Sequence, residues 1–505
     1  MSHKLLLSLI LLTPLLGALG IWLLRDRPNP REAVSLLTAL VLLGLVMALL
    51  PGVAAGERAS LELFELLPGI SIAFSAEPLG AGFAVVVALL WFVTVLYAIG
   101  YMRAHHEQNQ GRFYLFFALA IAATIGAAQA DNLLTLYLFY EALTLATYPL
   151  VTHGGEDKDR KGGRTYLGLL LGTSLVFLLL AMGWTYGVAG TLTFTPGGIL
   201  AQPDGSLITG LTPALLALLF ALFVFGTGKA ALMPFHRWLP AAMVAPTPVS
   251  ALLHAVAVVK LGVFAVLKVT VYIFGIETLN RYNAALLIQY VAAATLLLAA
   301  FRALGENNLK RRLAYSTISQ LAYIVLAATL ANSMSLAAGG LLIAAHAMAK
   351  ITLFFCAGMI LVSLHKTTVT ELDGIGRQMP VTLAAWFVAS LCIIGLPLTG
   401  GFWSKWYLAQ GALEAGQPLM LAVILLGSLL AMGYLIPPVI RAFFAAPLKQ
   451  PDPSSPAEPH SLATPVTTAE APRPALLALI FTATLSVLLF FAVQPMLGFL
   501  SGFTS

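Results

Sequence analysis

Ionisable side chains lie within several long apolar segments of this sequence, where such residues are rare. They are one glutamate, two histidines and five lysines: Glu141, His254, His346, Lys229, Lys260, Lys268, Lys350 and Lys405. A charged group at the centre of a bilayer costs at least about 2.5–3.5 kcal/mol on insertion scales, so such groups face protein or water rather than lipid. These side chains are therefore candidates for carrying protons through the membrane.

A lysine and a glutamate together can act as a switchable proton carrier. Burial disfavours the charged form of a lysine, and a nearby carboxylate favours that form again. Moving the influence of Glu141 away from a lysine would therefore release a proton. We predict that Glu141 and Lys229 form a functional ion pair near mid-membrane, because they are an acid and a cation in central segments.

The other ionisable residues extend this chemistry along the chain. His254 and Lys260 are six residues apart on one predicted helix and share its face only in part. Water, or hydroxyl groups such as those of Thr247 and Ser250, would have to complete a relay between them. We predict a polar axis across the middle of the membrane. It is expected to run through Glu141, Lys229, Lys260, His346, Lys350 and Lys405.

Some of these residues also have a purely structural interpretation. Lys268 lies near the end of its predicted helix and can extend its ammonium group to the membrane interface. Lys405 could anchor its helix in the same way. His254 can be an interhelical hydrogen-bonding residue. The two histidines could in principle ligate a haem, but each has a lysine nearby, and we expect no cofactor.

Two predicted helices are interrupted close to a lysine. Pro234 follows Lys229, and Pro397 lies in the glycine-rich stretch 395–401 that precedes Lys405. Proline breaks the helical hydrogen-bond ladder, and non-helical backbone at membrane depth is tolerated only where it lines protein or a water cavity. Paired interrupted helices are typical of inverted-repeat transporters. We predict two inverted five-helix repeats, helices 4–8 and 9–13, with Lys405 as an outward-facing terminal switch of the second.

The composition excludes several classes of function. Of the 505 residues, 59% are hydrophobic and 10% are charged, whereas globular domains carry about 25% charged residues. Cys356 and Cys392 are far apart in apolar runs, so neither an iron–sulfur cluster nor a paired zinc site is expected. Dinucleotide and P-loop motifs are absent from the sequence. We expect no cofactor, no metal, no nucleic-acid partner and no redox or hydrolytic site in this chain.

The apolar segments predict an all-α polytopic membrane protein of about 14 transmembrane helices. A spanning helix needs about 20 residues. The predicted spans are 4–24, 33–50, 79–101, 112–130, 132–151, 165–188, 211–232, 247–273, 283–304, 311–331, 336–364, 381–407, 417–444 and 475–499. The first is interpreted as a retained helix, because it has little positive charge at its start and ends without a small-residue cleavage site.

The basic residues of the loops indicate the orientation. Loops after odd-numbered helices hold 19 Lys and Arg residues, and the opposite loops hold three, namely Lys4, Arg58 and Arg281. Cytoplasmic loops carry the excess of basic residues. Both termini are therefore expected on the outer side of a bacterial inner membrane. The net charge of +6 follows from these loops and does not indicate nucleic-acid binding.

The chain divides into five predicted parts. They are N-terminal helices 1–3 with an outer-face hairpin (1–110, the hairpin within 52–78), a first five-helix repeat (111–273), a second repeat (274–446), a disordered cytoplasmic linker (447–474) and a C-terminal helix (475–505). The linker is rich in Pro, Ser, Thr and Ala, a composition that favours disorder.

At the interrupted helices the sequence resembles a known family. The segment Gly228–Pro240 (GKAALMPFHRWLP), continued by Ala245–Ala255 (APTPVSALLHA), looks like the signature of proton-conducting antiporter-like subunits. These subunits occur in respiratory complex I, in membrane-bound hydrogenases and in Mrp-type cation/proton antiporters. The resemblance covers roughly residues 75–445. It implies fourteen helices with two inverted five-helix repeats.

The resemblance also implies roles for individual residues. Glu141 matches the key glutamate of helix 5, Lys229 and Lys260 match the lysines of helices 7 and 8, and the segment His346–Lys350 matches a block in helix 11. Lysine at position 405 looks like the D subunit of the Mrp-type antiporter rather than the complex I subunit of this length, which has an acid there.

These features lead to one expected function and several alternatives. We expect a proton-translocating antiporter-like subunit of a Mrp-type complex, with other membrane subunits and protons as partners and sodium as a candidate partner. The alternative is a proton-pumping subunit of an NADH-quinone oxidoreductase or of a membrane-bound hydrogenase-type complex. A standalone carrier and a redox subunit that binds quinone are further possibilities. Identification of the co-purifying subunits would distinguish them.

Overall fold

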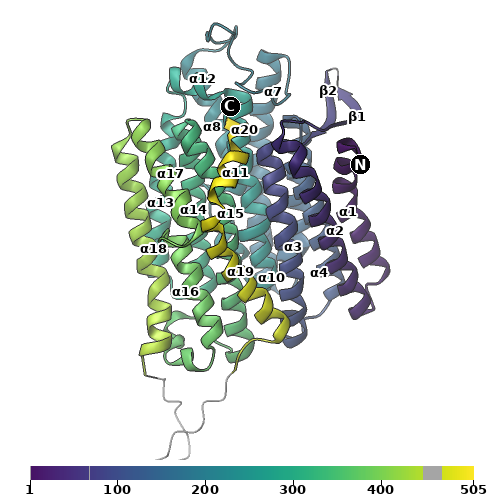
Figure 1. Ribbon diagram of the computed structural model, residues 1–505, viewed down its shortest axis with the longest axis vertical. Helices are drawn as coiled ribbons and strands as arrows, with labels where there is room; N and C mark the ends of the chain where they lie inside the picture. Colours follow the sequence, from purple (N-terminus) through teal and green to yellow (C-terminus); the bar gives the residue numbers. More distant parts are fainter. Residues whose placement is uncertain (1, 68, 447–468, 505) are drawn as a thin grey trace, which may run out of the picture.

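The computed structural model of the protein describes residues 2–67, 69–446 and 469–504. Long helices run side by side, and both ends of the chain lie at the same end of the bundle (Figure 1). The antiparallel strands β1 (Ser60–Leu67) and β2 (Ile70–Ser75) form a hairpin there, within the segment where a hairpin was expected. We call this the hairpin end. The opposite end, where residues 446 and 469 lie, is called the linker end; the predicted linker falls largely outside the described residues.

The first half of the chain supplies the helices that hold Glu141, Lys229, His254 and Lys260. Its helices are α1 (His3–Leu23), α2 (Pro28–Ala54), α3 (Pro78–Ala104), α4 (Gln110–Ala128), α5 (Leu133–Val151), α6 (Asp157–Thr173), η1 (Ser174–Leu178), α7 (Leu179–Ala189), α8 (Pro213–Gly226), η2 (Gly228–Ala230), α9 (Trp238–Ala241), η3 (Ala242–Val244), α10 (Thr247–Ala251), η4 (Leu252–Val256), α11 (Val258–Val269) and η5 (Thr270–Phe274).

The second half supplies the helices that hold His346, Lys350 and Lys405. Its helices are α12 (Ile276–Arg281), α13 (Leu286–Gly305), α14 (Leu309–Leu330), α15 (Ser333–Leu364), η6 (Val369–Leu372), η7 (Ile375–Arg377), α16 (Pro380–Ile394), α17 (Gly400–Glu414), α18 (Pro418–Phe444), α19 (Arg473–Phe491) and α20 (Val493–Thr504).

The helices confirm an all-α polytopic membrane protein. Within the described residues, 12 helices are long and apolar enough to cross a membrane, when continuous runs such as 157–189 and 247–274 are each taken as one. Two shorter apolar helices, α8 and α16, coincide with the predicted spans that contain the interruptions. The last predicted span is also divided, because a break at Ala492 separates α19 from α20.

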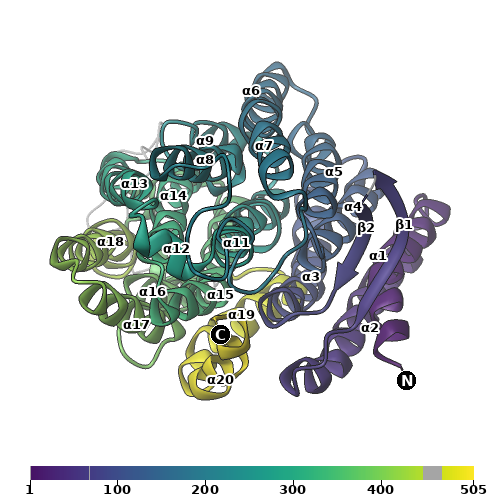
Figure 2. The ribbon, with the colours of Figure 1, turned by 90° about the horizontal axis from the view of Figure 1, so that it is seen from above.

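One helical run lies at the centre of the bundle. The run from α10 to η5 is buried along its whole length, and Figure 2 shows α11 enclosed by the other helices. A helix that is apolar on all sides must be covered on all sides. Two of its segments, η4 and η5, are π-helical, a geometry found mostly as single turns at functional sites. This run carries His254, Lys260 and Lys268.

The first interruption begins earlier than the sequence indicated. The predicted span continued to residue 232, but α8 ends at Gly226 and Lys229 lies in the short 3₁₀ turn η2. Gly226 and Gly228 end the helix, because glycine disfavours helix interiors. They also let the chain lie against Leu178 and Thr173, where a β-carbon would collide with those residues. Pro234 lies inside the interruption, not at its start.

The second interruption lies where it was predicted. Helix α16 ends at Ile394, and Gly395 follows with a left-handed φ of +88°, which glycine adopts at low cost at a helix C-terminus. Pro397 lies between α16 and α17. Leu398 also has a positive φ, of 67°, a conformation that is costly for a residue with a side chain.

Gly262 allows the central helix to touch the first interruption. A β-carbon at this position would collide with the backbone of Lys229 and Ala230. We expect Gly262→Ala to destabilise the protein by about 1–3 kcal/mol, the usual cost of overpacking, measured as a lower Tm of the purified protein in detergent. Gly44→Ala is the matched control, because nothing lies within 4 Å of a β-carbon there. Equal Tm values for the two variants would contradict this packing.

Candidate proton-translocation site

The side chain of Lys229 makes three different contacts with α5, and its backbone N–H donates to the Tyr140 hydroxyl at 3.1 Å. Its Nζ donates to the carbonyl oxygen of Tyr140 at 2.8 Å and to Oγ1 of Thr144 at 2.6 Å. The ammonium also lies 3.1 Å from the centroid of the Tyr140 ring, a cation–π contact. The lysine is fully buried. Non-helical backbone in the interruption thus places a lysine against the main chain of a neighbouring helix.

Glu141 is close to Lys229 but does not pair with it directly. Within the described residues no salt bridge joins the two side chains, and the carboxylate oxygens, although buried, accept no hydrogen bond. The Lys229 ammonium is bound by Tyr140 and Thr144 instead. Successive residues of a helix point about 100° apart, so the side chains of Tyr140 and Glu141 point in different directions. Glu141 still acts on Lys229 electrostatically. The predicted direct ion pair is absent from this conformation, and its functional role stays a prediction.

Lys260 and His346 meet at the centre of the bundle. Nζ of Lys260, on α11, is hydrogen-bonded to Nδ1 of His346, on α15. Both side chains are buried. An amine and an imidazole in direct contact can exchange a proton, because each can hold one. The structure therefore brings together two residues of the predicted axis, one from each half of the chain.

Lys350 and His254 are the other two ionisable residues of this region. Lys350 is one helical turn beyond His346 and donates to Oγ of Ser316 at 2.6 Å, and Ser316 donates to the Tyr434 hydroxyl at 3.0 Å. The ring of His254 packs 4.7 Å from that of Phe354. Neither nitrogen of His254 has a hydrogen-bond partner among the described residues. His254 is thus near the lysines without bonding to them.

Thr247 and Ser250 do not form the predicted relay beside His254 in the described part of the chain. Ser250 donates to the carbonyl oxygen of Ala245, in the loop before its own helix. Any link from His254 to Lys260 therefore needs other polar groups or water.

Lys405 binds the open end of the interrupted helix. Its Nζ donates to the carbonyl oxygens of Ile393 at 2.8 Å and Ile394 at 3.1 Å, and to Oγ of Ser428 at 2.9 Å. The lysine is 6% exposed. Side chains on a helix point back toward its N-terminus. The ammonium therefore lies at the level of the break, although the predicted position was further toward the hairpin end.

A polar stripe on α14 extends from Lys350 to Lys405, and it was not predicted from the sequence. Ser316 binds Lys350, the Tyr323 ring centroid lies 4.6 Å from Nζ of Lys405, and the buried amide of Gln320, between them in sequence, has no hydrogen-bond partner among the described residues. These three residues are at positions i, i+4 and i+7, on one helix face. This spacing of polar residues in an otherwise apolar span is the sequence feature from which the stripe could have been predicted.

Replacing Gln320 by leucine should interrupt this stripe. Leucine has a similar size but offers no hydrogen bonds, so proton transport is expected to fall by about tenfold or more while assembly is kept. Proton uptake into liposomes containing the complex measures the effect. Thr317→Val is the control, because the Thr317 hydroxyl donates to its own helix at Leu313. Equal transport by the two variants would remove Gln320 from the path.

Lys268 is buried and paired with protein groups near the hairpin end, whereas a snorkelling lysine would extend its ammonium group to solvent. The side chain is 1% exposed and forms an ion pair, with an N–O distance of 3.4 Å, to Glu77, which precedes α3. Its Nζ also donates to the carbonyl oxygen of Ala130 at 2.6 Å. Glu77 does not stand out in the sequence, because the residue lies just outside a predicted span.

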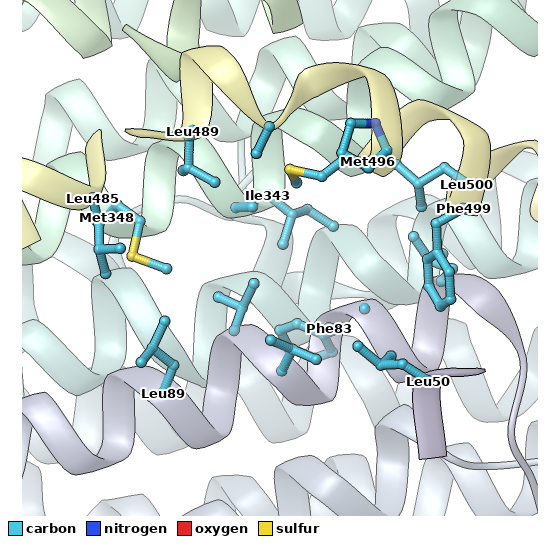
Figure 3. Close-up of a pocket in the computed structure, with 18 residues that line it drawn as sticks. Leu50, Phe83, Leu89, Ile343, Met348, Leu485, Leu489, Met496, Phe499 and Leu500 are labelled. Carbon is cyan, nitrogen blue, oxygen red and sulfur yellow. The ribbon is translucent and has the colours of Figure 1, made fainter. Parts of the chain in front are cut away.

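An apolar cavity lies beside the axis but is not part of it. It has a volume of about 370 Å³ and lies between α3, α15 and the C-terminal helices α19 and α20. Figure 3 shows Phe83, Ile343 and Met496 around it. Met348, between His346 and Lys350 in sequence, also lines it, but the lining offers no ionisable side chain. The lining therefore supplies no side chain that can hold a proton. Within the described residues, no three His, Cys, Asp or Glu side chains converge as metal ligands.

Two family profiles match the chain. The profile described as "NADH:quinone oxidoreductase/Mrp antiporter, TM" matches residues 130–431. The profile described as "NADH-Ubiquinone oxidoreductase (complex I), chain 5 N-terminus" matches residues 68–114. The first match includes every residue of the predicted axis.

Individual proteins agree with these profiles. The chain is 33% identical over 451 residues to NADH-quinone oxidoreductase subunit N of Desulforudis audaxviator, covering 88% of this chain and 87% of that protein. It is 31% identical to NAD(P)H-quinone oxidoreductase chain 5 of Picosynechococcus sp., covering 81% of this chain but only 64% of that longer protein.

The fold has also been seen experimentally. A chain in the structure of the Mrp complex from Dietzia sp. superposes with a TM-score of 0.83, at 23% identity, over 99% of this chain and 97% of that one. The profile that matches more than half of the chain and the relative of 33% identity show that the protein belongs to the NADH:quinone oxidoreductase/Mrp antiporter family of membrane subunits.

Proposed function

We propose that this chain is a proton-translocating, antiporter-like subunit of a multisubunit membrane complex of the Mrp-type cation/proton antiporter kind. The observation that carries the proposal is the row of buried ionisable side chains between helices, from Lys229 through the Lys260–His346 contact to Lys350 and Lys405. Charged groups at membrane depth are costly and mark ion or proton pathways.

The contacts support a proton moving along this row in steps. Each lysine binds a proton as an ammonium ion and passes it on as a neutral amine. His346 can accept a proton at Nδ1 from Lys260 and release one from Nε2, which has no protein partner among the described residues. The α14 stripe supplies polar groups between Lys350 and Lys405. Glu141 would favour the charged form of Lys229 when it moves closer.

We further propose a bacterial inner-membrane location with the hairpin end outside. The basic loops gather at the linker end, which fits the positive-inside rule. The division into residues 1–110, 111–273, 274–446, 447–474 and 475–505, with repeats at 111–273 and 274–446, remains our proposal. The interruptions after α8 and α16 are the features that favour it.

A second candidate function is a proton-pumping subunit of an NADH-quinone oxidoreductase-type complex. It is favoured by the relative named subunit N of such an oxidoreductase, which this chain matches over 88% of its length. The same axis would then be driven by a redox reaction in partner subunits rather than by a cation gradient.

Purification of the complex through a tag on this chain separates the two functions. The co-purifying subunits are identified by mass spectrometry, and the complex is reconstituted in liposomes. Proton movement driven by a sodium or potassium gradient supports the antiporter. Proton movement that requires NADH and quinone supports the pump. A chain that purifies alone and moves protons by itself would contradict both.

A further inference from the structure

A buried ion pair lies on the hairpin side of the axis, and the proposed function does not use it. Lys268 and Glu77 are 1% and 3% exposed, and their charged atoms are 3.4 Å apart. Glu77 also accepts a hydrogen bond from the Tyr272 hydroxyl at 2.9 Å. Its carboxylate caps α3 by accepting from the backbone N–H groups of Leu79 and Gly80. The cluster thus joins α3, α11 and η5.

The cluster continues the central helix toward the membrane surface. Lys260 and Lys268 both lie on α11, eight residues apart, which is about 12 Å along a helix. Tyr272 follows four residues later, in the π-helical segment η5. The other π-helical segment of this run, η4, contains His254. One face of the bundle centre therefore carries ionisable groups from mid-membrane to the hairpin end.

Two aromatic rings lie beside the Lys268 ammonium. Phe264 is one helical turn before Lys268 on α11, and its ring centroid is 5.6 Å away; Phe194 is in the loop after α7, and its ring centroid is 4.7 Å away. Ala130, whose carbonyl oxygen binds Lys268, is followed by the partly buried Asp131 in the loop between α4 and α5. Asp131 and the exposed Arg58 are the other charges that act on Lys268.

We propose that Glu77 and Lys268 form a proton-transfer site through which the axis exchanges protons with the hairpin-end surface. This inference rests on the proposed function, because it needs protons delivered at Lys260. In the step, an N–H bond of the Lys268 ammonium breaks and an O–H bond forms on Glu77, which leaves a neutral amine and a carboxylic acid. The acid then gives the proton to water at the surface, and the carboxylate returns. The amine accepts the next proton from the axis.

The contacts of Lys268 leave one neighbour that can take up its proton. The ammonium donates to the carbonyl oxygen of Ala130 at 2.6 Å and lies 3.4 Å from the Glu77 carboxylate. A carbonyl holds the ammonium in place but cannot take its proton away. The carboxylate is the neighbour that can accept it.

The test is a double variant that removes both charges together. A buried ion pair used only for structure can often be replaced by neutral residues without loss of stability. Glu77→Gln with Lys268→Met should therefore assemble normally in either case. If the pair transfers protons, transport in liposomes should fall about a hundredfold, the low end of the contribution of a positioned proton-transfer group. Wild-type transport by an assembled double variant would overturn the proposal.

A second variant covers the case in which the double variant fails to assemble. Lys268→Arg keeps the charge and the pairing but hardly releases its proton. An assembled Lys268→Arg complex that has lost transport supports the proposal, and one with normal transport overturns it. The matched control is Asp373→Asn with Arg441→Met, which removes a two-bond ion pair at the linker end and should leave transport unchanged.

The proposed function is tested separately in the same vesicles. If Glu141→Ala abolishes transport and the Glu77/Lys268 variants do not, only this inference fails. If the wild-type complex moves no protons under any driving force, the proposed function itself fails.

Discussion

Replacement of Lys229 by alanine is expected to abolish coupled proton transport while the complex still assembles. The ammonium is the only ionisable group in η2, and it is held by Tyr140 and Thr144 inside the bundle. Alanine leaves no group there that can hold a proton. We expect a loss on the order of a hundredfold or more, as for other positioned proton-transfer groups. Proton uptake by proteoliposomes, normalised to assembled complex, measures it.

Two further variants make this result specific. Lys161→Ala removes an exposed lysine of α6 and should transport normally. Glu141→Ala should lose transport as Lys229→Ala does, because the carboxylate acts on Lys229 through its charge without a direct bond. Glu141→Ala that transports at the wild-type rate would show that the acid is not needed.

Lys405→Arg is expected to keep the fold and lose transport. Arginine can donate to the carbonyl oxygens of Ile393 and Ile394 as lysine does, so the end of α16 remains bonded. Its guanidinium hardly gives up a proton. We expect transport to fall about a hundredfold, as expected for a blocked transfer step, with an unchanged Tm of the complex.

Lys405→Met separates the two roles of this lysine. It leaves the buried carbonyl oxygens without their donor, which costs about 1–3 kcal/mol, so the Tm should fall as well as transport. Near-normal transport by Lys405→Arg would instead identify the lysine as an anchor of the broken helix and remove it from the path.

The ionisable residues of the axis could be predicted from sequence, whereas most of their partners could not. A lysine such as Lys350 stands out because its neighbours along the chain are apolar. Its partner, Ser316, is an ordinary residue of another helix, and the contact depends on how α14 and α15 pack. For Lys229 and Lys405 the partners include main-chain carbonyl oxygens. Every residue has one, so residue type does not indicate which of them bind a lysine.

Glu77 shows a second limit of prediction from sequence. It lies two residues before the predicted span 79–101, and an acid at that position reads as part of a loop. The fold buries it, because the end of the hairpin, the loop between α4 and α5, and α11 meet above it. Because Glu77 is not recognisable as its buried partner in the sequence, Lys268 could be interpreted there as a residue that reaches the membrane interface.

The first interruption shows a third limit. Apolar residues continue to Leu232, so hydropathy extends the span past Gly226. Hydropathy indicates that a segment lies in apolar surroundings, but it does not indicate where the backbone changes direction. At the second interruption, glycine and proline mark the same change of direction openly, and the boundary of α16 was correspondingly easier to place.

Three of the buried lysines rest on oxygens that no substitution can remove. Lys229 donates to the carbonyl of Tyr140, Lys268 to that of Ala130, and Lys405 to those of Ile393 and Ile394. Any amino acid at those four positions still presents a carbonyl. Substitutions at these four positions can therefore shift the carbonyl oxygens but cannot remove them. In a saturation-mutagenesis screen, we expect Lys229 and Lys405 to tolerate few replacements, while Ile393 and Ile394 accept many apolar ones.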